Sequence, residues 1–215
     1  MRRDRTKIAV TDSTKLLKEL WQEIGECKKC HNLESFDKPQ FFGYSDAKIL
    51  LIGQAPGKKE IEKGIPFAGA AGRNLFNWLR IAGLTEEGVR RKIYMSAVMR
   101  CYPGESKRGG DLKPNKLQLK NCEYFLRKEV EILKPKLVLL VGKLAIEHFL
   151  GNVRLDEVVG KSFKCKVFNF DTMVIPLPHP SGKSPWHFKP ENRARITKAM
   201  HLLRVYKVSQ KEDIK

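Results

Sequence analysis

ILLIGQAPGKKEIEKGIPFAGAAGRNLFNWLRIA, residues 49–82, is the stretch that decides the fold of this chain. Its first four residues are apolar and predict a buried strand, which stops at the turn Gly53-Gln54-Ala55-Pro56-Gly57. A segment with glycine and proline, residues 64–69, follows, and the apolar residues after it have helical spacing up to a stop at Gly83. A strand, a long loop and a helix in this order are typical of an open α/β sheet, in which ligands bind beside the loops at the carboxyl ends of the strands.

The same alternation continues along the chain. Apolar runs predict further strands at 93–99, 137–142, 163–168 and 173–177, and helical periodicity predicts helices at 12–24, 116–133, 143–150 and from Pro190 onward. Because apolar strands that alternate with helices form a mostly parallel sheet covered on both faces, we predict an α/β fold. We expect one domain over residues 1–215, with an N-terminal helix and CxxC segment, residues 1–44, packed on it.

The chain is strongly basic. Over 215 residues, 42 Lys and Arg stand against 24 Asp and Glu, which leaves a net charge of +18. Such a charge attracts polyanions, and nucleic acid is the commonest polyanion inside a cell. An anionic membrane is a weaker alternative, because the sequence has no long basic amphipathic helix and no apolar run of membrane-spanning length. The basic amino terminus lacks the apolar core of a signal peptide, so we expect a cytoplasmic protein.

Five cysteines occur in the sequence, and a disulfide framework is not expected in the cytoplasm. Cys27 and Cys30 form a CxxC pair, while Cys101 and Cys122 bracket a basic loop with glycine and proline. A CxxC pair with two distant single cysteines suits either a [4Fe-4S] cluster or a four-cysteine zinc site. Nothing near Cys165 in the sequence resembles a ligand, so we expect it to be a packed thiol.

Three loops are expected to meet at one rim of the sheet, because the carboxyl ends of parallel strands lie at the same edge. These loops begin at Gln54, Cys101 and His179. The first loop offers polar groups on Gln54 and Glu60, and the ring of Phe67 either stacks on a planar ligand or packs in the core. His179 is held between two prolines and is a candidate for moving a proton or stabilising negative charge.

Six motifs follow one another in a specific order. They are GQAPG at 53–57, GIPFAGAAGRNL at 64–75, RCYPG at 100–104, Cys122 in its helix, LVLLVG at 137–142 and HPSG at 179–182. Together they resemble the uracil-DNA glycosylase superfamily, most closely its iron-sulfur branches, families 4 and 5. The resemblance implies a three-layer α/β/α sandwich around a mostly parallel central sheet. It also implies an enzyme that flips a deaminated base out of DNA and hydrolyses its N-glycosidic bond, which starts base-excision repair.

The resemblance assigns roles to three pocket residues. His179 would hydrogen-bond the departing uracil oxygen, and Phe67 would stack on the flipped ring. Glu60 would orient or deprotonate the attacking water.

Two positions depart from the family pattern. Family 4 usually has Glu where this chain has Gln54, which cannot act as a base but can position water or read a base edge. An Asn that often reads the uracil edge is replaced by Ala97. Ser96, Gln54 or backbone groups must then compensate, or the preferred base differs.

The resemblance further implies a structural [4Fe-4S] cluster and two DNA-contacting loops. Its cluster ligands are Cys27, Cys30, Cys101 and Cys122. The expected DNA contacts are Lys107 and Arg108 in the basic loop, and Ser181, Gly182, Lys183 and Trp186 in a loop that would enter the minor groove.

The leading hypothesis is therefore a monofunctional uracil-DNA glycosylase that acts on DNA containing deaminated bases. One alternative is a glycosylase of the same superfamily that prefers hypoxanthine or xanthine, which Ala97 motivates. The other is a non-catalytic iron-sulfur protein that binds DNA or senses damage, which Gln54 motivates. We expect a monomer located at the nucleoid, without membrane contact, and the sequence identifies no replication or repair protein as a partner.

Overall fold

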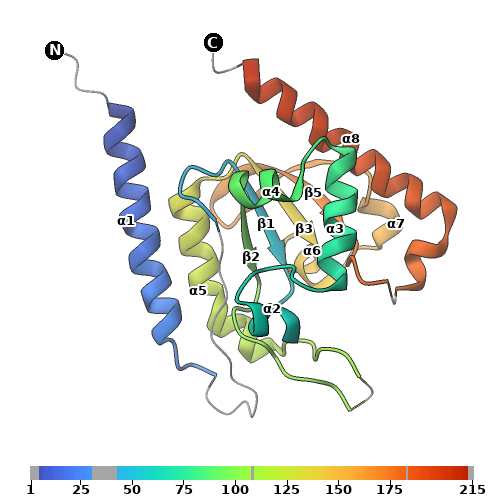
Figure 1. Ribbon diagram of the computed structural model, residues 1–215, viewed down its shortest axis with the longest axis horizontal. Coiled ribbons are helices and arrows are strands. Elements are labelled where there is room, and N and C mark those ends of the chain that lie inside the picture. Colours follow the sequence, from blue (N-terminus) through green and yellow to red (C-terminus); the bar gives the residue numbers. More distant parts are fainter. Residues whose placement is uncertain (1–4, 31–42, 108, 183, 213–215) are drawn as a thin grey trace.

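The computed structural model describes residues 5–30, 43–107, 109–182 and 184–212, and within these ranges the side chains of residues 12–209 (Figure 1). Helices and strands alternate along the chain, as the sequence predicts. In order they are α1 (Arg5–Glu26), β1 (Ile49–Gly53), α2 (Lys58–Lys63), α3 (Ala70–Ile81), α4 (Glu86–Lys92), β2 (Ile93–Ala97), α5 (Lys116–Leu133), β3 (Leu137–Val141), α6 (Lys143–Leu150), α7 (Leu155–Val158), β4 (Phe163–Val167), β5 (Phe170–Leu177), the 3-10 helix η1 (Pro185–Phe188) and α8 (Pro190–Glu212).

The strands form one sheet in the order β2-β1-β3-β5-β4. The first four of these run parallel, and β4 pairs antiparallel with β5 at the edge. Helices α1, α5 and α6 cover one face of the sheet, while α3, α4 and α8 cover the other (Figure 1). The prediction of an α/β/α sandwich around a mostly parallel sheet is confirmed.

Two layers of core lie on the two faces of the sheet, because successive side chains of a strand point in opposite directions. In β1, Leu50 and Ile52 pack toward α5, and Leu51 between them packs toward α3. All three side chains are fully buried. Burial on both faces explains why the central strands are apolar runs rather than alternating ones.

Some predicted boundaries were wrong. The second strand ends at Ala97 instead of residue 99, although the Val98 amide still donates to the Gly53 carbonyl over 3.0 Å. The last two strands form a tighter hairpin than predicted, because β5 already begins at Phe170. Helix α2 and the 3-10 helix η1 lie in segments that were expected to be loops, and no element was predicted at α4 or α7. Helix α2 contains no buried residue, so it has no apolar stripe by which its sequence could reveal it.

No helix in the described part of the chain is both long enough and apolar enough to cross a membrane. The parallel arrangement places the loops after β1, β2 and β5 at one edge of the sheet. The candidate active site lies there.

Candidate active site

A pocket opens at the carboxyl ends of β1 and β2, beside the paired residues Gly53 and Ala97. Its walls come from the loop after β1, the end of β2, the loop before α5 and the loop after β5. The lining residues are Gly53, Ala55, Pro56, Gly57, Glu60, Pro66, Phe67, Ala71, Met95, Ser96, Ala97, Asp111 and His179. Five of the residues predicted from the sequence are among them, and Gln54 is not.

Phe67 presents its ring to the pocket from a strained turn. Its φ of +55° is in the left-handed region, which is rare for a bulky residue. Gly72 in α3 makes this turn feasible, since a Cβ atom at position 72 would lie 1.7 Å from the Phe67 carbonyl oxygen. The half-buried ring also contacts the core layer under α3. Both expected roles of Phe67, core packing and a flat surface in the pocket, are therefore compatible.

Glu60 ties two glycine-containing segments of the pocket wall together. It lies in the first turn of α2, where its Oε2 accepts a hydrogen bond from the Gly57 amide and its Oε1 accepts one from the Gly69 amide, both over 3.1 Å. Both carboxylate oxygens therefore already bind backbone N–H groups. The Glu60 carboxylate therefore holds two segments of the pocket wall together and also lines the pocket.

His179 lies at the mouth of the pocket with its Nδ1 directed back to the protein. Nδ1 accepts a hydrogen bond of 3.3 Å from the Ser181 amide. The residue is exposed, yet enough protein surrounds its ring to lower the pKa of His179, and the nearby His187 lowers it further. Asp111 and Glu60 act in the opposite direction, with a smaller effect. A neutral imidazole whose Nδ1 accepts carries its proton on Nε2, so His179 can donate to a ligand.

The wall beside Ala97 presents few polar side-chain atoms. Ser96 lines the pocket, but its hydroxyl donates to Oε2 of Glu129 over 2.8 Å, in the interior. The half-buried Gln54 accepts from the Met99 amide through its backbone carbonyl, over 3.1 Å. Polar recognition of a ligand on this wall would therefore depend on backbone groups.

A buried polar network lies behind this wall. The carboxylate of Glu129, in α5, accepts hydrogen bonds from the Tyr94 hydroxyl over 2.8 Å and from Ser96, and it forms an ion pair with Arg100. The Trp21 indole in α1 donates to the Tyr94 hydroxyl over 2.8 Å. Arg100 and Glu129 are completely buried. The network connects α1, β2 and α5 directly behind the pocket.

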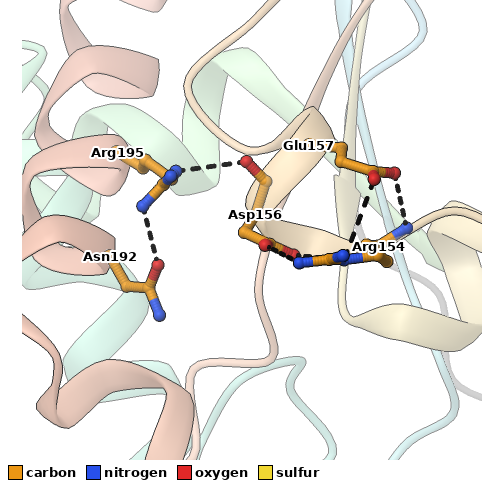
Figure 2. Close-up of polar contacts among 5 residues, drawn as sticks. All are labelled: Arg154, Asp156, Glu157, Asn192 and Arg195. Atoms are coloured by element: carbon orange, nitrogen blue, oxygen red, sulfur yellow. Dashed lines mark hydrogen bonds and ion pairs between the residues drawn. The ribbon is translucent and has the colours of Figure 1, made fainter.

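The segment after β5 is held by α8, which also bonds to α7. Asn192 donates from Nδ2 to the Trp186 carbonyl in η1 over 2.9 Å. Arg195 in turn donates to the Asn192 side chain over 3.0 Å and to the Asp156 carbonyl over 3.1 Å (Figure 2). Trp186 is half-buried against the core, and Phe188 two residues later is 66% exposed. The predicted minor-groove loop thus ends in a short helix held by the protein.

Two polar residues near the site were not selected from the sequence. Asp111 lines the pocket from the loop before α5. His187 lies in η1, and its Nε2 is 2.7 Å from the His179 carbonyl oxygen. An acidic residue directly after Gly109-Gly110 in a basic loop was the only sequence signal for Asp111.

The predicted DNA-contacting residues fall in different environments. Lys107 and Gly182 are exposed, and Ser181 is half-buried with its amide bonded to His179. Arg108 and Lys183 lie outside the described residues.

Four cysteines converge on one small cavity between the end of α1, the end of β2 and α5. Cys27, Cys30, Cys101 and Cys122 line it together with Arg100 and Asn121. Burial and the charges of the three other cysteines raise the pKa of the Cys101 thiol to about 12. The Asn121 amide group lies 3.6 Å from the Cys30 sulfur and donates to the Lys29 carbonyl over 3.0 Å. In the described part of the chain, no group of three or more His, Cys, Asp or Glu side chains is arranged to hold a single metal ion. Cys165 is half-buried and packs against the core, as predicted.

Comparisons with known proteins identify a family and several relatives. A model of the uracil DNA glycosylase superfamily matches residues 39–204. The type-4 uracil-DNA glycosylase of Sulfurisphaera tokodaii is 28% identical over 77% of this chain and 74% of that protein. The type-4 enzyme of Archaeoglobus fulgidus is 29% identical over 77% of this chain and 82% of its own length. The type-5 uracil-DNA glycosylase of Pyrobaculum aerophilum is 29% identical over 48% of each chain. The solved structure of Pedobacter heparinus SMUG2 matches 77% of each chain with a TM-score of 0.43 and 14% identity.

Proposed function

Because the chain belongs to the uracil DNA glycosylase superfamily, we propose that it is a monofunctional glycosylase that removes uracil from DNA. The observation that carries this proposal is the pairing, in one pocket, of the Phe67 ring with the Nε2 side of His179. A ring and an N–H donor in the same pocket suit a flat, oxygen-bearing base that has been flipped out of the helix. The relatives named above act on uracil in DNA, according to their names.

The proposed reaction is hydrolysis of the N-glycosidic bond. The bond between C1′ and N1 breaks, its electron pair stays on the base, and the sugar becomes positively charged. His179 would donate a hydrogen bond from Nε2 to a uracil oxygen and so stabilise the departing anion. Phe67 would hold the ring in the plane that this bond requires. Glu60, held by two backbone amides, would place negative charge near the sugar and help to orient water.

We further propose that Cys27, Cys30, Cys101 and Cys122 hold a [4Fe-4S] cluster. Each iron of such a cluster takes one thiolate, so the four sulfurs stand further apart than around one zinc ion. Their convergence on one small cavity supports the cluster. When bound, the cluster would link the end of α1 to β2 and α5. Iron and sulfide analysis with visible absorbance tests this, and a colourless protein that contains zinc contradicts it.

A substrate panel tests the enzymatic proposal. End-labelled duplexes with uracil, hypoxanthine or xanthine at one position are incubated with the protein, and abasic sites are then cleaved with alkali. We expect cleavage at uracil, and a rate about 10²–10³-fold lower for His179→Ala. His201→Ala, in an exposed position of α8, is the matched control and should keep the wild-type rate. Intact DNA binding without cleavage of any substrate would show a non-catalytic protein instead.

Hypoxanthine or xanthine is the second candidate substrate, and Ala97 favours it. Ala97 lines the pocket with a methyl group. An amide side chain at this position would instead discriminate uracil by two hydrogen bonds. Faster cleavage at a purine than at uracil in the same panel identifies this alternative. We further propose that the protein acts as a monomer on DNA at the nucleoid.

A further inference from the structure

Asp111 brings a second carboxylate to the pocket, beside that of Glu60. It belongs to the loop before α5, whose two arms are joined by an antiparallel bridge between Glu105 and Asp111. The Leu112 amide donates to the Gly104 carbonyl over 2.8 Å and so closes this loop. Asp111 is therefore held against the pocket by backbone pairing, although its side chain is exposed.

The absence of a side chain at Gly57 lets the two carboxylates approach. A Cβ atom at Gly57 would lie 2.7 Å from Oδ2 of Asp111 and 2.7 Å from Oε2 of Glu60, which is closer than real Cβ contacts. Both oxygens thus lie against the same point of the backbone. Glu60, Asp111 and His179 all line the same pocket.

The two carboxylates differ in what they already bind. Each oxygen of Glu60 accepts a backbone amide. Within the described part of the chain, the Asp111 side chain has no hydrogen-bond or ion-pair partner. Its lone pairs are open to a ligand in the pocket. Gln54, at the start of the first loop, carries a neutral amide that cannot take up a proton.

We propose that Asp111 binds the attacking water and accepts its proton. The inference rests on the proposed glycosylase function. As the C1′–N1 bond breaks and its electrons leave with the base, the water oxygen forms a bond to C1′. One water proton passes to the Asp111 carboxylate and from there to solvent or to N1 of the released base. Glu60 then serves mainly to hold the loop that frames this water, and its negative charge adds to that of Asp111 beside the cationic sugar.

Asp111→Asn tests this assignment, with Glu105→Gln as the matched control. The two substitutions remove one negative charge from the same bridged pair of residues, but Glu105 does not line the pocket. Single-turnover cleavage of a uracil duplex should slow by about 10²-fold or more for Asp111→Asn and stay within about twofold of wild type for Glu105→Gln. Binding to a duplex with a stable abasic analogue should not weaken in either variant. Asp111→Glu should recover part of the lost rate.

Each outcome separates the inference from the proposed function. A wild-type protein without activity on the substrate panel would overturn the proposed function. An active wild type with an equally active Asp111→Asn variant would overturn the role of Asp111 alone. If Glu105→Gln lost as much of the cleavage rate as Asp111→Asn, both residues would act only by maintaining the loop. Gly57→Ala provides an independent check, because the Gly57 φ of −92° accepts alanine and the three atoms nearest to the added methyl group all belong to the two carboxylates. Its circular dichroism should match wild type while its cleavage rate falls by about tenfold or more.

Discussion

His179 can donate toward the pocket only while its Nδ1 accepts the hydrogen bond from Ser181. Protonation of Nδ1 would set two N–H groups against each other and break the turn after β5. Burial of the ring and the neighbouring His187 oppose this protonation by lowering the pKa of His179. The protein therefore preserves a neutral donor near pH 7 without a carboxylate partner on the imidazole.

Nitrogen-15 NMR of the histidine rings tests this description. We expect the neutral form of His179 to carry its proton on Nε2 and its pKa to lie below the ordinary value of 6.5. Since the unfolded chain then binds more protons than the folded one, the free energy of unfolding should fall as the pH drops below about 6.5. His148, whose pKa burial also lowers, contributes in the same direction, so His148→Asn is the control background. A neutral ring protonated on Nδ1 would contradict the proposed hydrogen-bond geometry.

Phe67 should contribute mainly through the face of its ring. Phe67→Ala keeps the left-handed turn but removes the stacking surface, which is worth about 1–3 kcal/mol per base. Single-turnover cleavage of uracil DNA should therefore slow by about 10–100-fold. Phe67→Tyr keeps an aromatic face and should retain most of the rate. Equal rates for Ala and wild type would leave core packing as the only role of this side chain.

At the scale of elements, Glu129 joins α5 to the end of β2. Its carboxylate is shared among Tyr94, Ser96 and Arg100, so the position of the strand end under the pocket depends on one helix. Arg100 directly precedes Cys101 and lines the cavity of the four cysteines. Ser96, bound to the same carboxylate, lines the pocket, so this network lies between the pocket and the four cysteines.

Glu129→Gln should destabilise the protein strongly while changing its volume little. The substitution leaves the Arg100 guanidinium buried without a counter-charge, which costs about 3–5 kcal/mol. Glu131→Gln on the same helix, where Glu131 pairs at the surface with Lys128, should cost less than about 1 kcal/mol. Urea denaturation gives both values. A similar small loss for both variants would show that Arg100 finds another partner in the interior.

Over the whole molecule, the positive charge should dominate DNA affinity. A net charge of +18 favours contacts with the phosphate backbone, which release bound counterions and make affinity depend on salt. Such contacts hold the protein on DNA without reading its sequence. The pocket must then provide the selection of the damaged base.

Titrations of a duplex containing an abasic analogue measure this contribution. Between about 50 and 200 mM salt, we expect the affinity to fall by about 10³-fold, as for a protein with roughly six phosphate contacts. Lys107→Gln, beside the pocket loop, should reduce the slope of log affinity against log salt by about one. Lys166→Gln, on the edge strand β4, should leave it unchanged. An affinity independent of salt would mean that the charge serves another purpose.

The amino-acid sequence by itself determined the sheet, its helical layers and the rim on which the site is built. Those features follow from local periodicity, because runs such as Leu50 to Ile52 are apolar for burial on both faces, and glycine and proline mark where strands stop. The motifs around Phe67 and His179 are also local features, since each is a continuous run of residues. They could therefore identify the family without the structure.

Only the tertiary structure decided which side chains meet in the pocket and what they already bind. Asp111 and Glu60 line the same pocket although 51 positions separate them in the sequence, because the bridged loop before α5 holds Asp111 there. Ser96 turns its hydroxyl away from the pocket, because a carboxylate in α5 lies behind it. The direction of a loop side chain depends on contacts with residues far away in the chain, and no periodicity in the sequence records them.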